Sequence, residues 1–385
     1  MKILVSCGEP SGDLYAGALT ESLLALEPSA RVYGLGGEKF RAAGGESIED
    51  YRGLTVTGLT EALSVLPRSY SIYHHLVKVA KTERPDVFVP IDFPDFNFRL
   101  AKAISHLGIP VVYYVCPQLW AWRRGRIHAM KRFVQRALVI FPFEEVLYKQ
   151  ENIPVDFVGH PLLDLCQVTS DKKGILRENG FDPNCPTVAL LPGSRPNEVQ
   201  SILPDLIDAA LLIRQRIPSV QFLIARASDL DDRLFDPLSD LLATGQSTVV
   251  LESQTDNVLK ASDFVVTASG TATVQTAIHG RPMVVVYRVS PVTYRLVRAF
   301  ANVDAVGMVN LIAGHKIVPE LIQDAFTPQA VCDEVVNFLS DPARVTKVCR
   351  ELKMVREQLG CSGASRRAAE LVLSEAHRNH SPLLQ

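Results

Sequence analysis

Short runs of apolar, often β-branched residues alternate along the chain with longer stretches in which apolar residues recur every three or four positions. The short runs are typical of buried parallel strands and the longer ones of amphipathic helices. Ten strands are predicted in this way, at residues 2–7, 30–35, 86–91, 110–115, 137–142, 187–192, 220–225, 247–252, 263–268 and 282–287. Strands that alternate with helices predict an α/β protein whose parallel sheets carry helices on both faces.

The series of strands is interrupted in the middle of the chain by a proline-containing passage, GHPLLD, a polar helix at 171–179 and the turn FDPNCP. We therefore expect a domain boundary near residues 162–171, with domains at 1–165 and 166–340. No strand is predicted after Tyr287, and the chain from about residue 328 has the pattern of helices. Residues 341–385 are expected to form a helical tail that packs back across the domains. The carboxyl ends of both sets of strands are expected to line a cleft.

Composition narrows the class of protein. The 385 residues are 47% hydrophobic and carry a formal net charge of −2, which gives no electrostatic argument for a nucleic-acid partner. Seven cysteines without a CxxC pair or a nearby histidine suit a reducing compartment and argue against a zinc site or a disulfide framework. The first apolar run is too short for a signal peptide, and without an 18-residue apolar run any membrane contact is expected to be peripheral.

Polar residues in the first half follow predicted strands. The loop GEPSGD contains Glu9, Ser11 and Asp13, and the last two are predicted to cap the next helix. The loop matches neither the dinucleotide fingerprint nor a P-loop, so a plain strand-to-helix turn is an equal alternative. Asp92 ends a buried strand, where a carboxylate is costly unless it is paired or functional, and we predict that it is a general base. Asp95 is interpreted as a helix cap.

His160 is a second candidate base, with a histidine held by backbone hydrogen bonds as the alternative. In the second half, the motif PGSRPNEV supplies Gly193, Ser194 and Arg195, and Arg195 is suited to clamp a phosphate. The motif SGTATVQ puts residues Ser269, Gly270 and Thr271 at a helix N-terminus, which favours a diphosphate. Each motif has a plain helix-capping turn as its alternative, but two on one sheet edge favour a nucleotide diphosphate.

Three further features are ambiguous. Trp120 and Trp122 flank a basic stretch that begins at Arg123, which fits a local anion site, an anionic membrane surface or a solvated helix face. Asp229 and Asp231 have the spacing of a metal-binding pair, but helix capping accounts for them better and no metal is predicted. Leu59, Leu63 and Leu66 form an apolar stripe on a helix that Pro67 is expected to end, with a buried core helix as the alternative.

Taken in order, nine blocks resemble the lipid-A-disaccharide synthase family: GEPSGD, PIDFPDFN, CPQLWAWR, FPFEEVLY, FVGHPL, LLPGSR, ASGTATVQ, MVVVYR and NLIAGHKIVPELIQ. The resemblance covers residues 8–323 and implies a GT-B fold with two Rossmann-like domains, the acceptor site in the first and the nucleotide-sugar site mainly in the second. It implies an inverting, metal-independent glycosyltransferase without a cofactor. Such an enzyme joins UDP-2,3-diacylglucosamine to 2,3-diacylglucosamine 1-phosphate and releases UDP and a β-1,6-linked disaccharide.

The resemblance also implies roles for single residues. Asp92 matches the proposed catalytic base of the family, and Glu9 and Ser11 would face the reacting sugars. The nucleotide would lie near Arg195, the helix start at 269–271, Gln275 and a set in the last block: Asn310, Glu320 and Gln323. The family usually has glutamate at position 275, where it is expected to hold the ribose. Leu63, Leu66, Trp122 and Arg123 would lie on the acceptor and membrane side.

The implied setting is the cytoplasmic face of the inner membrane, with peripheral contact. A homodimer is compatible with the sequence, which leaves the oligomeric state open. One alternative is another GT-B enzyme, such as an undecaprenyl-linked glucosaminyltransferase or a UDP-sugar epimerase, although the blocks WAWR and VPELIQ favour the first family. A second alternative is a non-catalytic, membrane-associated UDP-sugar binder, which the retained Asp92 and Arg195 disfavour.

Overall fold

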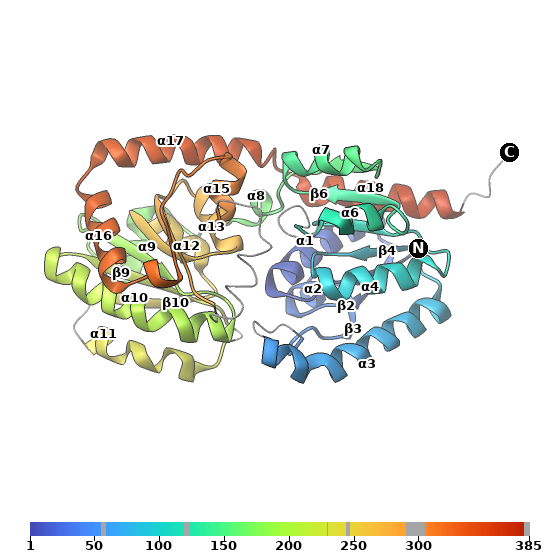
Figure 1. The fold of residues 1–385 in the computed structure, drawn as a ribbon, viewed down its shortest axis with the longest axis horizontal. Coiled ribbons are helices and arrows are strands. Elements are labelled where there is room, and N and C mark those ends of the chain that lie inside the picture. Colours follow the sequence, from blue (N-terminus) through green and yellow to red (C-terminus); the bar gives the residue numbers. More distant parts are fainter. Residues whose placement is uncertain (55–58, 119–123, 229, 244–246, 290–304, 381–385) are drawn as a thin grey trace. The chain divides into compact units, whose positions relative to one another are not determined.

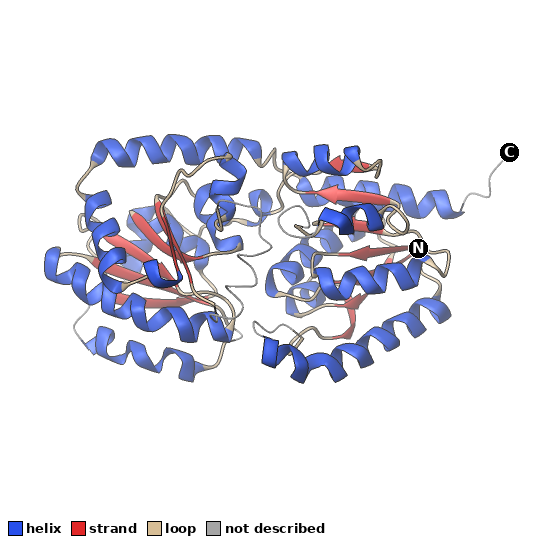
Figure 2. Cartoon of the chain, in the orientation of Figure 1, coloured by secondary structure: helices blue, strands red, loops and turns tan. Residues whose placement is uncertain are grey.

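The chain forms two compact units, seen in a computed structural model that describes residues 1–54, 59–118, 124–228, 230–243, 247–289 and 305–380 (Figure 1). Among these residues, unit 1 comprises 1–165 and 359–380, and unit 2 comprises 166–289 and 305–358. Each unit has parallel sheets with helices packed around them (Figure 2), which confirms the predicted α/β class.

The strands of unit 1 follow a doubly wound order. They are β1 Lys2–Ser6, β2 Arg31–Leu35, β3 Glu46–Glu49, β4 Val87–Pro90, β5 Val112–Tyr114, β6 Arg136–Val139 and β7 Val155–Phe157. Hydrogen bonds join them in the orders β3-β2-β1-β4 and β5-β6-β7, and every pair is parallel. Parallel bridges Phe88–Val111 and Ile91–Tyr114 connect β4 to β5. The strand order reverses between β1 and β4, which is where open α/β sheets bind their ligands.

Helices of unit 1 connect these strands. They are α1 Pro10–Leu26, α2 Glu38–Ala42, α3 Leu59–Glu83, α4 Pro94–Ser105, α6 Arg124–Met130, α7 Pro142–Gln150, α8 Leu162–Leu165 and, from the far end of the chain, α18 Ala364–His380. The strands lie at the centre of the unit, where Ile3, Leu4 and Val89 have no exposed surface. Burial of such side chains supplies the main favourable free energy of folding.

Unit 2 repeats this plan with six strands. They are β8 Thr187–Leu191, β9 Gln221–Arg226, β10 Thr248–Glu252, β11 Phe264–Ala268, β12 Met283–Tyr287 and β13 Glu320–Ile322. The order β10-β9-β8-β11-β12-β13 puts the reversal between β8 and β11. The helices are α9 Lys172–Glu178, α10 Pro196–Arg216, η1 Asp232–Leu238, α11 Ser239–Ala243, α12 Thr255–Ala261, α13 Thr271–Ile278, α15 Met308–Ala313, η2 Gln323–Ala325, α16 Pro328–Leu339 and α17 Pro342–Gln358.

The C-terminal helices divide between the units. Helix α17 packs on α13, α15 and α16 of unit 2, whereas α18 packs on α1, β4 and β5 of unit 1. The carboxylate of Asp164 accepts hydrogen bonds from the backbone N–H groups of Gly363 and Ala364, at 2.6 and 2.9 Å, at the start of α18. Helix α18 is therefore an integral part of unit 1.

The prediction that strands stop after Tyr287 was wrong. Strand β13 pairs with β12, from Val285–Glu320 to Tyr287–Ile322. Two other strands, β3 and β7, were also missed, and all three are at sheet edges. Edge strands are short and polar because one side faces solvent, so they lack the apolar run that marks a central strand.

The prediction that Pro67 ends a helix was also wrong. Pro67 lies inside α3, which continues to Glu83. Pro67 is exposed, and the buried residues Ile72, Leu76 and Ala80 fix the following turns against the unit, which compensates for the hydrogen bond that proline removes.

No helix among the described residues combines the length and apolarity needed to cross a membrane.

Helix α1 begins at Pro10 with Glu9 as its N-cap residue, so neither Ser11 nor Asp13 caps it. The buried carboxylate of Asp13 instead accepts hydrogen bonds from the backbone N–H groups of Gly37 and Lys39, at 2.6 and 2.9 Å, at the start of α2. A negative charge at that position stabilises the N-terminus of α2.

Candidate functional site

In unit 1, two loops meet at the carboxyl ends of the adjacent strands β1 and β4. A Cβ atom added at Gly8, in the first loop, would lie 2.1 Å from the ring of Phe93, in the second. Only glycine permits this close approach. Glu9 and Ser11 lie in the first loop and the first turn of α1 and are half-buried. The packing thus brings Glu9, Ser11 and Asp92 to the same sheet edge.

The backbone of Asp92 is held in a conformation that non-glycine residues rarely adopt. Its φ angle is +43° and that of Phe93 is +52°. The Asp92 N–H is directed at the carbonyl oxygens of Tyr114 and Val115, at 3.3 and 3.2 Å. The Asp92 carbonyl accepts from the Tyr113 hydroxyl at 3.0 Å. Such backbone costs about 1–3 kcal/mol per residue and is common at functional sites, so the surrounding contacts must maintain it.

The buried side chain of Asn97, on α4, ties these loops together. Its Nδ2 donates to the carbonyl oxygens of Ser6 at 3.0 Å, Ile91 at 3.1 Å and Asp92 at 2.9 Å, and its Oδ1 accepts from the Ser6 hydroxyl at 2.6 Å. We did not predict this role. The sequence feature that could have indicated it is an amide side chain on the buried face of an amphipathic helix, within the block PIDFPDFN.

Tyr113 remains a hydrogen-bond donor in this arrangement. Burial raises the pKa of its hydroxyl well above the usual value, and the negative charge of Asp92 raises it further. The hydroxyl therefore stays protonated at neutral pH and continues to donate to the Asp92 backbone.

Asp95 does not cap α4, because Phe93 is the N-cap residue. Asp95 lies in the first turn and is exposed, and its Oδ1 accepts from Arg126 Nη1 at 2.8 Å. An acid in the first turn is still favourable for the helix.

His160, the second candidate base, is buried and bound to the backbone of unit 1. Its N–H donates to the Leu359 carbonyl at 2.9 Å, and its ring Nδ1 accepts from the Leu162 N–H at 3.2 Å. Burial lowers the pKa of the imidazole from 6.5 to about 3. Such a group is a weak base at neutral pH, and this geometry favours the structural interpretation.

Several predicted residues on the acceptor side lie outside the described residues. These are Trp120, Trp122 and Arg123, and the side chain of Leu63 is also outside the description. On the described part of α3, Leu66 is 53% exposed and Tyr70 is 68% exposed. Their exposure contradicts the alternative of a fully buried core helix.

In unit 2, the loop after β8 folds around a buried carboxylate. Glu198 accepts from the Ser194 N–H at 3.2 Å through Oε2, and its Oε1 lies 2.9 Å from Arg195 Nη1. Gly193 has a φ angle of +124°, and a Cβ there would lie 2.7 Å from Glu198. Arg195 is thus oriented by Glu198, which the sequence analysis did not identify. Arg195 is itself the N-cap residue of α10.

The loop after the adjacent strand β11 leads to the N-terminus of α13. Gly270 is the N-cap residue with a φ angle of +145°, and no side chain of the described residues caps the helix. Within the described part of the chain, a Cβ at Gly270 would meet no atom within 4 Å. The Ser269 hydroxyl donates to the Val306 carbonyl at 3.1 Å. Because β8 and β11 pair directly, Arg195 and residues 269–271 share one sheet edge.

Gln275 lies on the same helix and is bonded within unit 2. Its Nε2 donates to Asp256 Oδ1 at 2.7 Å. This bond leaves the amide oxygen as the group of Gln275 that could accept from a ligand hydroxyl. Asp256 was not singled out from the sequence.

The three predicted residues of the last block form hydrogen bonds within unit 2. Asn310 is buried, and its Nδ2 donates to Glu320 Oε1 at 2.7 Å. Glu320 accepts from the N–H groups of Val306 and Gly307, both at 2.9 Å. Gln323 makes two hydrogen bonds with the backbone of Val289, at 3.0 and 2.9 Å. These side chains hold Val289, after β12, and residues 306 and 307, before α15.

Curated relatives match almost the whole chain. The lipid-A-disaccharide synthase of Koribacter versatilis is 45% identical over 384 residues, covering 98% of this chain and 99% of the relative. The lipid-A-disaccharide synthase of Geobacter metallireducens is 39% identical over 372 residues, covering 97% and 96%.

Solved structures are similar in fold. A UDP-GlcNAc 2-epimerase from Neisseria meningitidis bound to UDP-GlcNAc superposes with a TM-score of 0.67 at 16% identity, covering 97% of this chain and 100% of that one. MurG from Acinetobacter baumannii superposes with a TM-score of 0.55 at 12% identity, covering 97% and 99%. The two doubly wound units are those of the GT-B fold, as expected. The family model for lipid-A-disaccharide synthetase matches residues 3–373, and the chain belongs to that family.

Proposed function

We propose that the protein is a glycosyltransferase that forms the lipid A disaccharide. It would transfer diacylglucosamine from UDP-2,3-diacylglucosamine to the 6-hydroxyl of 2,3-diacylglucosamine 1-phosphate, with release of UDP. The family match over residues 3–373 carries this proposal. Relatives with this name are 45% and 39% identical over nearly their full lengths, which supports it further.

Asp92 is proposed as the general base that takes the proton of the acceptor hydroxyl. The reaction is a single in-line displacement at the anomeric carbon, which inverts its configuration. Support comes from the position of Asp92 at the switch point of the sheet and from the backbone held by Asn97 and Tyr113. A base fixed in this way needs little reorganisation at the moment of reaction. Glu9 and Ser11, at the same edge, are proposed to contact the sugars.

Arg195 and the N-terminus of α13 are proposed to hold the diphosphate of the donor. A guanidinium and free backbone N–H groups stabilise the charge that grows on departing UDP, without a metal at the reacting atoms. Glu198 would orient Arg195 through the 2.9 Å ion pair. The Gln275 carbonyl oxygen is proposed to accept from the ribose, while Asn310, Glu320 and Gln323 hold the neighbouring residues 289, 306 and 307.

Both proposed substrates carry acyl chains, so the enzyme must take them from a bilayer. We expect peripheral attachment at the cytoplasmic face of the inner membrane, with the exposed Leu66 and Tyr70 of α3 inserted among the lipids.

Mass spectrometry of the products tests the function. After incubation with both acylated glucosamine substrates, the expected result is UDP together with a tetraacylated disaccharide monophosphate. Release of UDP without a disaccharide, interconversion of UDP-sugars, or binding of UDP-sugar without turnover would each contradict the proposal and point to one of the alternative classes.

A further inference from the structure

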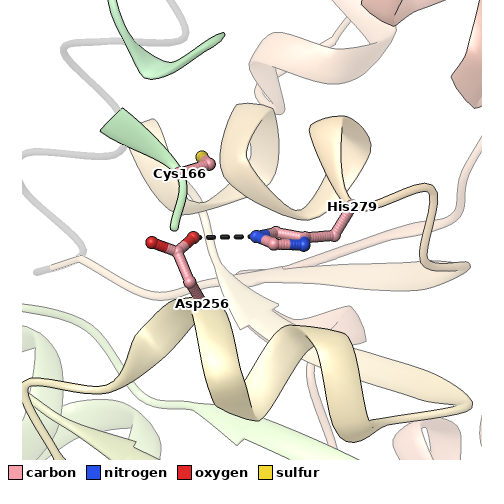
Figure 3. Close-up of side chains that lie close together, drawn as sticks. All are labelled: Cys166, Asp256 and His279. Atoms are coloured by element: carbon pink, nitrogen blue, oxygen red, sulfur yellow. Dashed lines mark hydrogen bonds and ion pairs between the residues drawn. The ribbon is translucent and has the colours of Figure 1, made fainter. Parts of the chain in front are cut away.

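Three side chains with metal-binding atoms lie close together in unit 2 (Figure 3). The Cys166 Sγ, an Asp256 carboxylate oxygen and a His279 ring nitrogen are all within 4.8 Å of one another. Cys166 is the first residue of unit 2, Asp256 is in the first turn of α12, and His279 is the C-cap residue of α13. Folding thus brings together residues that are far apart in the sequence, which explains why cysteine spacing gave no sign of a metal site.

Hydrogen bonds already orient this cluster. Asp256 Oδ1 lies 2.8 Å from His279 Nε2 and 2.7 Å from Gln275 Nε2, and Oδ2 accepts from the Gln167 N–H at 3.2 Å. Burial alone would raise the pKa of Asp256, but the hydrogen bonds from His279 and Gln275 outweigh it and lower that pKa. Asp256 also forms a hydrogen bond with Cys166, so a bound ion would take the place of the contacts that Cys166 and His279 make with the carboxylate.

The set of donor atoms suits one class of ion. Thiolate sulfur, imidazole nitrogen and carboxylate oxygen are the ligands that Zn²⁺ prefers, and three protein ligands leave a fourth tetrahedral position for water. In a tetrahedral zinc site the ligand atoms are roughly 3.5 Å apart, so the cluster needs shifts of about an ångström. The His279 side chain is 9% exposed and that of Asp256 is 19% exposed, which limits competition from water.

The thiol is the group that a metal would change most. Burial raises the pKa of Cys166, the negative charge of Asp256 and a hydrogen bond with it raise it further, and the positive charge of Arg356 opposes them. A bound cation would displace the Cys166 proton to solvent and form the metal–sulfur bond, and the neutral His279 ring would carry its N–H on the nitrogen that does not bind the metal.

We propose that Cys166, Asp256 and His279 form a binding site for one divalent transition-metal ion of the zinc class. The site adjoins Gln275, because Gln275 donates a hydrogen bond to Asp256. The metal ion would take no part in the transfer step. The proposal is independent of the function proposed above.

Titration of the full chain with Zn²⁺, followed by calorimetry, tests the site. One equivalent should bind to the wild type, and Cys166→Ser or His279→Gln should weaken binding by roughly 100-fold or more. Matched controls are Cys185→Ser and His315→Gln, because Cys185 Sγ also lies near a carboxylate, 3.7 Å from Asp182, and His315 also lies near one, 3.5 Å from Glu351. Both controls should bind like the wild type. With Co²⁺ as the probe, a sulfur-to-metal charge-transfer band should appear in the wild type and be absent in Cys166→Ser.

A measurement on the wild type alone avoids any effect of a substitution on folding. Zn²⁺ should slow alkylation of Cys166, read by peptide mass spectrometry, and should not slow alkylation of the exposed Cys361. Absence of stoichiometric binding, binding that survives Cys166→Ser and His279→Gln, or equal alkylation of Cys166 with and without Zn²⁺ would overturn the proposal.

Discussion

The side-chain amide of Asn97 donates a hydrogen bond to the backbone carbonyl of Asp92, with 2.9 Å between nitrogen and oxygen. The same amide also binds the carbonyls of Ser6 and Ile91, so a single buried residue of α4 fixes the ends of β1 and β4. The position of the proposed base therefore depends on a residue that need not touch substrate.

Replacement of Asn97 by alanine is expected to lower the free energy of unfolding by roughly 2–4 kcal/mol, because buried carbonyls and the Ser6 hydroxyl lose their partner. Turnover at a permissive temperature should fall about ten- to a hundredfold, since Asp92 loses its support. Urea unfolding and a UDP-release assay measure the two effects. The exposed Asn184→Ala is the control and should change neither. Unchanged stability of Asn97→Ala would mean that this network does not hold the loop.

Arg195→Ala is expected to weaken binding of UDP by roughly 2–4 kcal/mol, because a guanidinium oriented by Glu198 would be lost from the diphosphate. Calorimetry with UDP measures the change. The matched control is Arg233→Ala, since Arg233 is also paired with an acid of unit 2, at 2.7 Å from Asp231, but is 83% exposed. If Arg195→Ala and wild type bind UDP equally, Arg195 is only a helix-capping residue.

His160 should make the protein sensitive to mild acid. Its pKa is lowered from 6.5 to about 3 in the folded chain, so between these pH values the unfolded chain binds more protons than the folded chain. The contribution of His160 to the free energy of unfolding is therefore fully present above about pH 6.5. It is lost as the pH falls, with a slope of up to about 1.4 kcal/mol per pH unit. His160→Asn should flatten the slope of unfolding free energy against pH in this window. Identical slopes for the variant and wild type would exclude a buried neutral imidazole.

The exposed apolar surface of α3 should bind membranes. Leu66→Ser combined with Tyr70→Ser is expected to reduce binding to anionic vesicles about tenfold or more, because each buried apolar side chain contributes about 1.5–3 kcal/mol. Vesicle co-sedimentation measures binding. Met354→Ser on α17 is the control, since Met354 is an equally exposed apolar residue at 51%. Binding by the double variant at the wild-type level would exclude this surface.

The central strands could be predicted from the sequence, whereas the edges could not. Strands such as β1 and β11 are buried on both faces and appear as continuous apolar runs. The edge strand β3 has the sequence ESIE, and β7 has VDF, which give no such signal. Their pairing depends on the neighbouring strand, which local periodicity does not contain.

For the candidate site, position after a strand correctly placed Asp92, Arg195 and the start of α13 at the carboxyl edges of the sheets, because these edges are predictable once the strands are known. Partners from other segments could not be found in this way. Cys166 and Asp256, for example, are 90 residues apart in the sequence and meet only through tertiary packing. The contact between Glu198 and Arg195 is local, but it depends on the turn at Gly193, which the sequence pattern does not specify.

The proposed mechanism depends above all on Asp92, which would remove the proton of the acceptor hydroxyl. Asp92→Asn keeps the size of the side chain and removes its basicity, so turnover with both acylated substrates should fall by about 10²–10⁴-fold while UDP affinity stays near the wild-type value. Asp95→Asn, three residues away and exposed, is the matched control and should retain turnover within a few-fold. Of these two variants, only Asp92→Asn should show this loss. Turnover of Asp92→Asn within a few-fold of wild type would contradict the proposed mechanism.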